Sequence, residues 1–208
     1  MKRVLYVIVF LMAILPLSMD GRTAADFFVD APTSQLFLLN RNTRLDMLDY
    51  FNSGMATTST NTLNGRSKIV RNEPLSLVVE VSSSSTMQFA LVTVKSDTLI
   101  AVIETVNTPV PDSSIRFYKS DWTEAKAQPE MPTYKSFITK EKKAAVKTAI
   151  VPDMIFYTID FDAEHGEFVF LNTTTGYYVA ADRPDGVDLM SPSIIMRFDG
   201  KKFVDVTR

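Results

Sequence analysis

The sequence has no cysteine and only one histidine, His165, in 208 residues. Without cysteine the chain cannot form a disulfide, so packing and hydrogen bonds must hold its fold. Zinc and iron sites of the usual kind need several histidine or cysteine ligands, which this chain cannot supply. A Ser-His-Asp triad could form only around His165. We therefore expect neither a metal of this kind nor a cofactor.

Glycine is also scarce, and positive charge is not in excess. The seven glycines are scattered singly, so the chain has no glycine-rich loop that would hold a phosphate. Nucleotide, flavin and hydride chemistry therefore have no support. The formal net charge is −2, and no basic stripe is present that would bind a phosphate backbone. We expect no nucleic-acid partner.

The N-terminus has a basic start, then the apolar run 4–15, and then the small residues 23–25. This layout is typical of a secretory signal peptide, and the run is shorter than the roughly 20 residues that cross a bilayer. We expect residues 1–25 to be a signal peptide, cleaved after Ala25 or a few residues earlier. The mature protein is then exported to the periplasm or cell surface, without a transmembrane segment. An uncleaved anchor is the alternative.

The clearest amphipathic helix spans residues 43–53. Leu45, Leu48 and Phe51 recur at a spacing of three, which is helical spacing. Thr43 and Asp46 form a capping-box pattern at its start. Gly54 stands where a helix commonly ends. We expect this helix to cover one apolar face of the strands that follow.

Runs of alternating, β-branched residues separated by turn residues come next and predict an antiparallel meander. The dipeptide Asn64-Gly65 predicts a hairpin that precedes them, with Ile69 and Val70 on the returning arm. The predicted strands are 77–81, 87–95, 99–106 and 115–119.

The pattern then begins again. Residues 139–150 place apolar side chains on one side and lysines on the other, as in a helix that Pro152 would end. Strand-like runs follow at 154–162, 167–172, 177–181 and 194–198.

We therefore predict an α+β fold with one antiparallel sheet of about eight strands. Two helix-plus-four-strand repeats build this sheet, with both helices on one face. The first half is 26–125 and includes an N-terminal arm, and the second half is 126–208, all within one compact domain. A chance likeness between two ordinary meanders stays open as the alternative.

The densest polar cluster lies between Asp160 and Glu167, and its candidate site residues are Asp160, Asp162, Glu164 and His165. Alternating carboxylates could bind calcium, or serve as a carboxylate pair in acid–base hydrolysis of a glycoside. Their spacing does not match an EF-hand loop. The simplest interpretation is a hairpin whose acids lie on the exposed face of a strand.

Three further residues are candidates for binding. Tyr178 follows another tyrosine, so one of the two must point outward and could contact a sugar or a protein. Arg116 and Arg197 occupy similar places in the two halves, and they are most simply exposed strand residues that pair with acids across the sheet.

The first half carries two long motifs and a later run. These are Asn42-x-Arg44-x-Asp46-Met47-Leu48-Asp49-Tyr50-Phe51-x-x-Gly54-Met55, then Thr60-Asn61-x-Leu63-x-Gly65, and Asp112-Ser113 to Trp122. They resemble a family of exported, uncharacterised proteins from Bacteroides-type bacteria. The resemblance implies a secreted or periplasmic domain and supplies no catalytic residues. The predicted topology is also similar to the β-lactamase-inhibitor-protein fold, which favours binding over catalysis, although fold does not fix function.

The few reactive side chains favour a non-enzymatic binding module over an enzyme. We expect it to engage a protein or a cell-envelope glycan through its sheet face or hairpin tips. One alternative is a carboxylate-dependent hydrolase around Asp160–Glu167. Another is a structural component of an envelope assembly.

Overall fold

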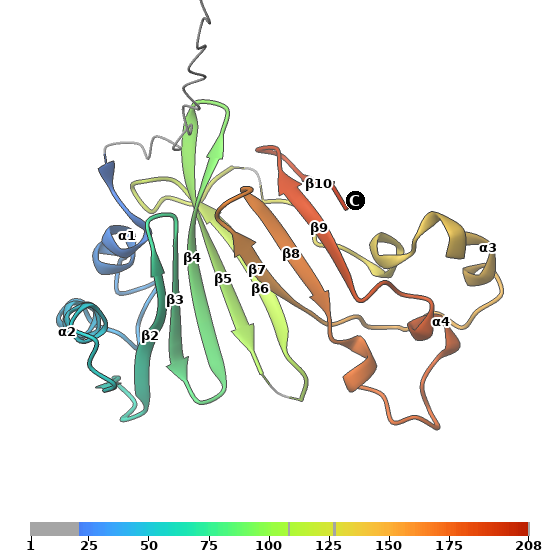
Figure 1. Cartoon of the computed structure of the whole chain (residues 1–208), viewed down its shortest axis with the longest axis horizontal. Helices are drawn as coiled ribbons and strands as arrows, with labels where there is room; N and C mark the ends of the chain where they lie inside the picture. The colour runs from blue at the N-terminus through green and yellow to red at the C-terminus, as the bar shows by residue number, and fades with distance from the viewer. Residues whose placement is uncertain (1–20, 108, 127, 208) are drawn as a thin grey trace, which may run out of the picture.

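The computed structural model describes residues 21–107, 109–126 and 128–207, and it consists of a helical layer and two antiparallel sheets (Figure 1). The large sheet lies in the middle. The helices pack on one of its faces and the small sheet on the other. The expected signal-peptide run 4–15 lies outside the described residues.

The large sheet is a six-stranded meander in which every strand pairs with its neighbour in sequence. The predicted strands are confirmed as β3 to β6. The hairpin expected at Asn64-Gly65 is confirmed between β1 and β2, but residues 61–65 form its loop, so it is not a two-residue turn. Asn64 has a positive φ of 61° and Gly65 does not, whereas the two-residue turn typical of Asn-Gly needs both. The strands are β1 (Ser59–Thr60), β2 (Arg66–Glu73), β3 (Ser76–Ser82), β4 (Ser85–Val94), β5 (Asp97–Val106) and β6 (Asp112–Tyr118).

The small sheet has the strand order β10-β9-β8-β7. Its strands are β7 (Tyr157–Asp162), β8 (Glu167–Asn172), β9 (Ser193–Phe198) and β10 (Phe203–Asp205). The strand expected at 177–181 was wrong, because a 3₁₀ turn η4 (Thr174–Gly176) and a loop occupy this part of the chain. Tyr177 packs against Phe156 and Tyr178, with ring centroids 4.8 and 5.1 Å apart, and not against a neighbouring strand.

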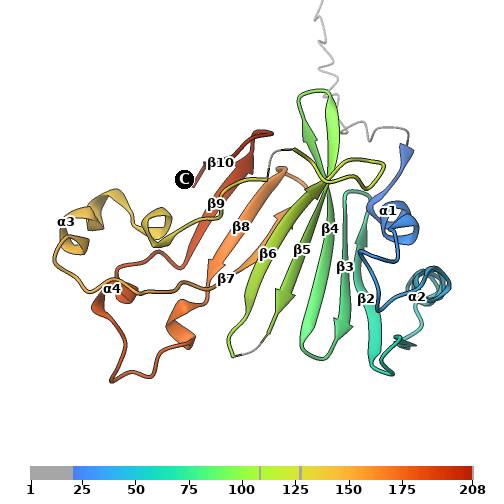
Figure 2. The same ribbon diagram turned by 180° about the vertical axis from the view of Figure 1, so that it is seen from behind.

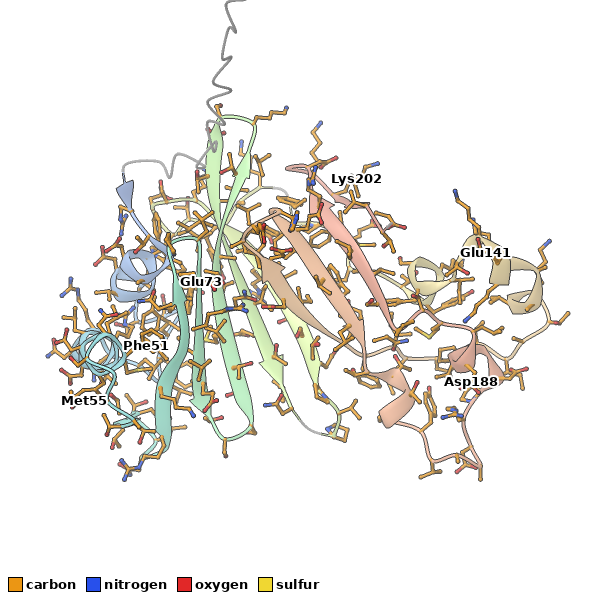
Figure 3. The ribbon with its side chains drawn as sticks, in the orientation of Figure 1. Phe51, Met55, Glu73, Glu141, Asp188 and Lys202 are labelled. Atoms are coloured by element: carbon orange, nitrogen blue, oxygen red, sulfur yellow. The ribbon has the colours of Figure 1, made fainter. Side chains whose placement is uncertain are left out.

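The single eight-stranded sheet and its two helix-plus-four-strand repeats were therefore wrong. The second helix is reduced to η3 (Lys140–Lys142) and α3 (Lys143–Val146). It covers no sheet, because Ala144 and Ala145 are exposed and bury no apolar face. Figure 3 shows Glu141, in η3, at the opposite end of the molecule from Phe51. The remaining short elements are η2 (Tyr134–Phe137) and α4 (Asp185–Asp188).

The helix expected at 43–53 is confirmed as α2 (Arg41–Asn52), which packs beside α1 (Ala24–Asp30). Gly54 follows its end with a φ of +67°, as expected. The predicted cap at Thr43 was wrong, because the Asn40 side chain accepts the hydrogen bond of the Thr43 amide. Along the described ranges, no helix is long and apolar enough to cross a membrane.

The buried face of α2 is centred on Arg44 and Met47, and Leu45 is partly exposed. The Arg44 Nη1 donates to the carbonyl oxygens of Phe28 and Ala31, both at 2.7 Å. These carbonyls lie at the C-terminal end of α1, where a positive charge is favourable. Burial lowers the pKa of Arg44 from its ordinary value. The orientation of α2 therefore depends on a polar contact that an apolar periodicity cannot reveal.

Strand β7 crosses the face of the large sheet that the helices do not cover. Its alternate backbone amides point to one edge and donate to side chains of the large sheet. Tyr157 N donates to Asp112 Oδ1 at 3.3 Å, and Ile159 N to Ser113 Oγ at 3.1 Å. Phe161 N donates to Gln88 Oε1 at 3.1 Å. Side chains thus replace a neighbouring strand along this edge.

Gln88 on β4 is the most buried of these partners, with 5% of its surface exposed. Its Nε2 donates to Ser76 Oγ at 2.9 Å and to the Phe161 carbonyl at 3.4 Å. The amide thereby bonds both backbone groups of Phe161, as a paired strand residue would. Asp160, directly before Phe161 on β7, is bound by both Nη atoms of Arg71 at 2.6 and 3.3 Å.

The apolar core between the sheets is largely aromatic. Phe117 of the large sheet stacks on Phe198 of the small sheet with ring centroids 4.1 Å apart. Phe168 and Phe170 are fully buried in the same cluster. Burial of this area drives docking of the sheets, and the polar contacts along β7 fix where they dock.

Replacing Gln88 with alanine should destabilise the fold by about 2–4 kcal/mol, because it leaves the buried N–H and C=O of Phe161 without partners. Gln128 provides a matched control. It also bonds the N–H and C=O of a strand residue, Phe117, but it is exposed. Water can replace its amide, so Gln128→Ala should cost less than about 1 kcal/mol. Denaturant unfolding measures both values, and equal losses would contradict this role of Gln88.

The start of α1 bears on the expected cleavage after Ala25. Thr23 and Asp26 form a capping box, and the Ala24 amide donates to the Pro74 carbonyl at 2.9 Å. We propose that processing occurs before Thr23. A chain that begins at Gly21 should be about 1–2 kcal/mol more stable than one that begins at Asp26, since the latter lacks the cap. Denaturant unfolding of both chains measures this difference. Equal free energies of unfolding would show that the cap does not stabilise the fold.

Candidate functional site

The acidic cluster predicted from the sequence lies on the β7–β8 hairpin, and most of its members form ion pairs. Asp160 binds Arg71, and the Asp162 Oδ2 lies 2.7 Å from His165 Nδ1. Glu167 is buried and receives a bond of 2.6 Å from Arg197. Glu164 lies exposed at the turn. Most charged side chains of the hairpin therefore pair either with one another or with arginines on β2 and β9.

This arrangement does not suit acid–base hydrolysis. A general acid of this type needs a carboxyl group whose pKa is raised toward neutrality. Burial raises the pKa of Asp162, but hydrogen bonds from the His165 ring and from the amides of Glu164 and His165 outweigh it. The net pKa lies below its usual value. A hollow of about 360 Å³ beside Glu164, His165 and Arg197 is open to solvent.

The remaining candidates do not join this cluster. Arg197 lies beside it through Glu167. Tyr178 lies in the loop after η4 and contacts Tyr177. Arg116 lies on β6 of the other sheet. Across the described ranges, no group of three or more His, Asp or Glu side chains could hold a metal ion.

A second region has the features of a binding site. Helices α1 and α2 pack over β2, β3 and β4. Figure 2 shows that, among the described residues, no helix lies over the outward faces of β5 and β6 on that side of the sheet. Because strand side chains alternate between faces, this side of β5 and β6 presents Glu104, Val106, Ser114 and Arg116 to solvent.

Two adjoining hollows of about 230 and 200 Å³ lie on this uncovered face. We call them together the Trp122 groove, and both are lined by Gln35, Phe37, Met87 and Glu104. The larger hollow adds Arg116 and Trp122, and is mainly polar. The smaller hollow adds Leu38, Val81 and Val106, and is mainly apolar.

Trp122 is the sole tryptophan of the chain. Its φ of 64° is a strained backbone conformation for a bulky residue. The indole packs against Phe89 and Tyr118, with ring centroids 6.3 and 5.6 Å away. Its Nε1 is shielded from solvent and, among the described residues, finds no hydrogen-bond partner. Backbone strain and an unsatisfied donor both single out this residue, and such outliers cluster at functional sites.

The groove also carries opposite charges that do not pair with each other. Glu104 and Arg116 lie on neighbouring strands, and within the described ranges no ion pair involves either of them. The Tyr118 hydroxyl donates to Gln35 Oε1 at 3.0 Å. Burial raises the pKa of this hydroxyl, and the charge of Arg116 offsets part of the rise. Tyr118 therefore stays neutral, and the groove has no net charge.

Of the Trp122 groove, sequence reasoning had identified only Arg116. Glu104 reads as an ordinary exposed strand residue, and Phe37 as part of an apolar loop. The signal that could have found the site is the sole tryptophan placed directly after the polar turn Lys119-Ser120-Asp121. That position is unusual for a residue that would otherwise belong to the core.

Comparisons with known proteins give a family and a fold. A sequence model of the family described as "Protein of unknown function (DUF3256)" matches residues 16–203. No curated protein matches significantly. The solved "Structure of a domain of an uncharacterized protein from Porphyromonas gingivalis W83" is similar, with 18% identity and a TM-score of 0.69. The match covers 90% of this chain and 100% of that chain. These findings agree with the resemblance to uncharacterised Bacteroides-type proteins.

The His165–Asp162 pair yields a titration test. The hydrogen bond to Asp162 raises the pKa of His165 above its ordinary 6.5. A raised histidine pKa stabilises the folded hairpin below the unfolded value, and this contribution is lost as pH rises through the folded value. By NMR, Asp162→Asn should return the His165 pKa toward 6.5. Glu164→Gln is the control and should change it less, because Glu164 acts only through its charge. An unchanged pKa in Asp162→Asn would contradict the pairing.

Proposed function

This chain belongs to the DUF3256 family of proteins of unknown function, and we propose that it is an exported, non-enzymatic binding protein. Its ligand is a protein or a cell-envelope glycan, bound in the Trp122 groove. The observation that carries the proposal is the indole N–H of Trp122, which is buried and has no hydrogen-bond partner among the described residues. Trp122 lines the same hollow as Glu104 and Arg116, which form no ion pair in the described ranges.

The energetics of the groove support binding. A buried donor without a partner costs about 1–3 kcal/mol. A ligand acceptor recovers this if the indole turns so that Nε1, which the protein shields from solvent, faces the groove. The large exposed ring of Phe37, of which 65% of the surface is accessible, gains by becoming buried. The adjoining polar and apolar hollows match the usual composition of binding sites, which combine apolar walls with a few polar groups.

The alternatives have less support. A hydrolase around Asp160–Glu167 would need carboxyl groups free for acid–base work, and three of them are committed to ion pairs. A structural component of an envelope assembly would use broad surfaces and would not need the strained Trp122. Export itself rests on the basic and apolar pattern before residue 16.

Because Trp122 is the sole tryptophan of this chain, its fluorescence reports on the groove once the emission of the added fraction, measured alone, has been subtracted. A bacterial envelope extract is divided into a protease-digested glycan fraction and a glycan-depleted protein fraction. We expect one fraction to change the emission saturably. Phe37→Ala should weaken the effect about tenfold, because it removes exposed ring area. Tyr177→Ala is the control, since Tyr177 is an exposed aromatic outside the groove, and should have no effect. If neither fraction changes the emission, the proposed function is wrong.

A further inference from the structure

We infer that the ligand of the Trp122 groove is a neutral oligosaccharide that carries acetamido groups. This inference rests on the proposed function and adds the chemistry of the ligand. The relevant observation is that a groove without net charge offers separate donors and acceptors, an exposed ring and an adjoining apolar hollow.

The position of the groove does not favour recognition by strand addition. Its floor is the face of β4, β5 and β6, whose central residues pair in continuous register from strand to strand. The backbone groups of β4 and β5 are therefore occupied, and strand addition would need the outer edge of β6, which is the last strand of the sheet. That edge is engaged at Phe117, which bonds Gln128. A ligand that lies on the face of the sheet, and not along this edge, meets side chains.

The side chains supply hydrogen-bonding groups of both kinds. Arg116 and the Trp122 indole can only donate, and Glu104 can only accept. Gln35 Oε1 already accepts from Tyr118, so its amide N–H groups remain to donate. A sugar hydroxyl both donates and accepts, so one hydroxyl can donate to Glu104 while its neighbour accepts from Arg116.

The charge balance selects against ionic ligands. An anionic sugar would be attracted by Arg116 but repelled by Glu104 on the adjacent strand. A cationic sugar would be attracted by Glu104 but repelled by Arg116. A neutral hydroxyl pair satisfies both side chains, and a site built to bond hydroxyls strongly disfavours ligands that leave its polar groups unpaired.

The apolar features account for the rest of the ligand. Phe37 exposes its ring at the rim, and such a ring packs against the C–H face of a pyranose. The smaller hollow of about 200 Å³ is lined by Leu38, Val81 and Val106. It offers no charged group other than Glu104 at its boundary with the larger hollow. The lining is mainly apolar although it includes Ser85 and Thr86, so an acetamido methyl group gains more there than a bare hydroxyl does.

The test uses the full-length mature protein and Trp122 fluorescence, with N-acetylchitotetraose as the probe. Three comparison probes differ from it in a defined way. Cellotetraose lacks the acetamido groups, chitosan tetramer is cationic, and tetragalacturonate is anionic. We expect saturable binding of N-acetylchitotetraose, binding of cellotetraose weaker by about tenfold, and no binding of the charged tetramers.

Substitutions in the groove test whether the probe binds there. Glu104→Ala and Arg116→Ala should each weaken binding about tenfold or more, because each leaves ligand hydroxyls unpaired. Both residues are exposed, and unchanged thermal unfolding verifies that the variants fold. Arg66→Ala is the matched control, since Arg66 is an exposed strand arginine near the opposite edge of the large sheet, and should bind as the parent does.

The outcomes separate the two proposals. Tighter binding of a charged tetramer, or unchanged affinity in both groove variants, overturns the neutral-oligosaccharide inference. So does the absence of N-acetylchitotetraose binding when the envelope protein fraction still changes Trp122 emission, and in that case the groove remains the site, with a protein ligand. If no probe and no envelope fraction changes the emission, both proposals fail.

Discussion

The arrangement of the molecule depends on how the free backbone edge of β7 is hydrogen-bonded. This edge lies against the face of the large sheet, away from water, where unpaired amides would be costly. Gln88, Ser113 and Asp112 accept these amides in place of a strand. The aromatic core favours any close contact of the two sheets, whereas these directional bonds select one line of contact. The small sheet therefore packs on the large sheet and does not extend it.

This docking also determines where a ligand could bind. The small sheet covers one face of β4–β6, and the two helices cover β2–β4 on the other. The outward face of β5 and β6 is left on the helix side. The loop that leads away from β6 places Trp122 at this face, and the loop between α1 and α2 places Phe37 beside it. The Trp122 groove thus exists because the helical layer covers only part of its face of the large sheet.

Local structure was largely predictable from the sequence. Alternation and turn residues predicted β3 to β9 except for the run 177–181, and helical spacing predicted α2. The assembly was not predictable, because its deciding residues resemble ordinary surface residues. Gln88 and Ser113 occupy polar positions in alternating strands, yet both are buried. Arg44 is a charged residue, yet its spacing of four and seven residues from Leu48 and Phe51 places it on the buried side of α2, where it binds carbonyls of α1. The groove combines residues from distant segments, which a linear pattern does not bring together.

Amide hydrogen exchange along β7 tests most directly whether side chains hold its edge. We predict that the amides of Ile159 and Phe161 exchange as slowly as those at the centre of β8, since each donates to a buried side chain in the interface. Exchange of these two amides as fast as that of exposed loop amides would contradict the account. It would show that the edge of β7 is open to water and that the sheets are held by apolar contact alone.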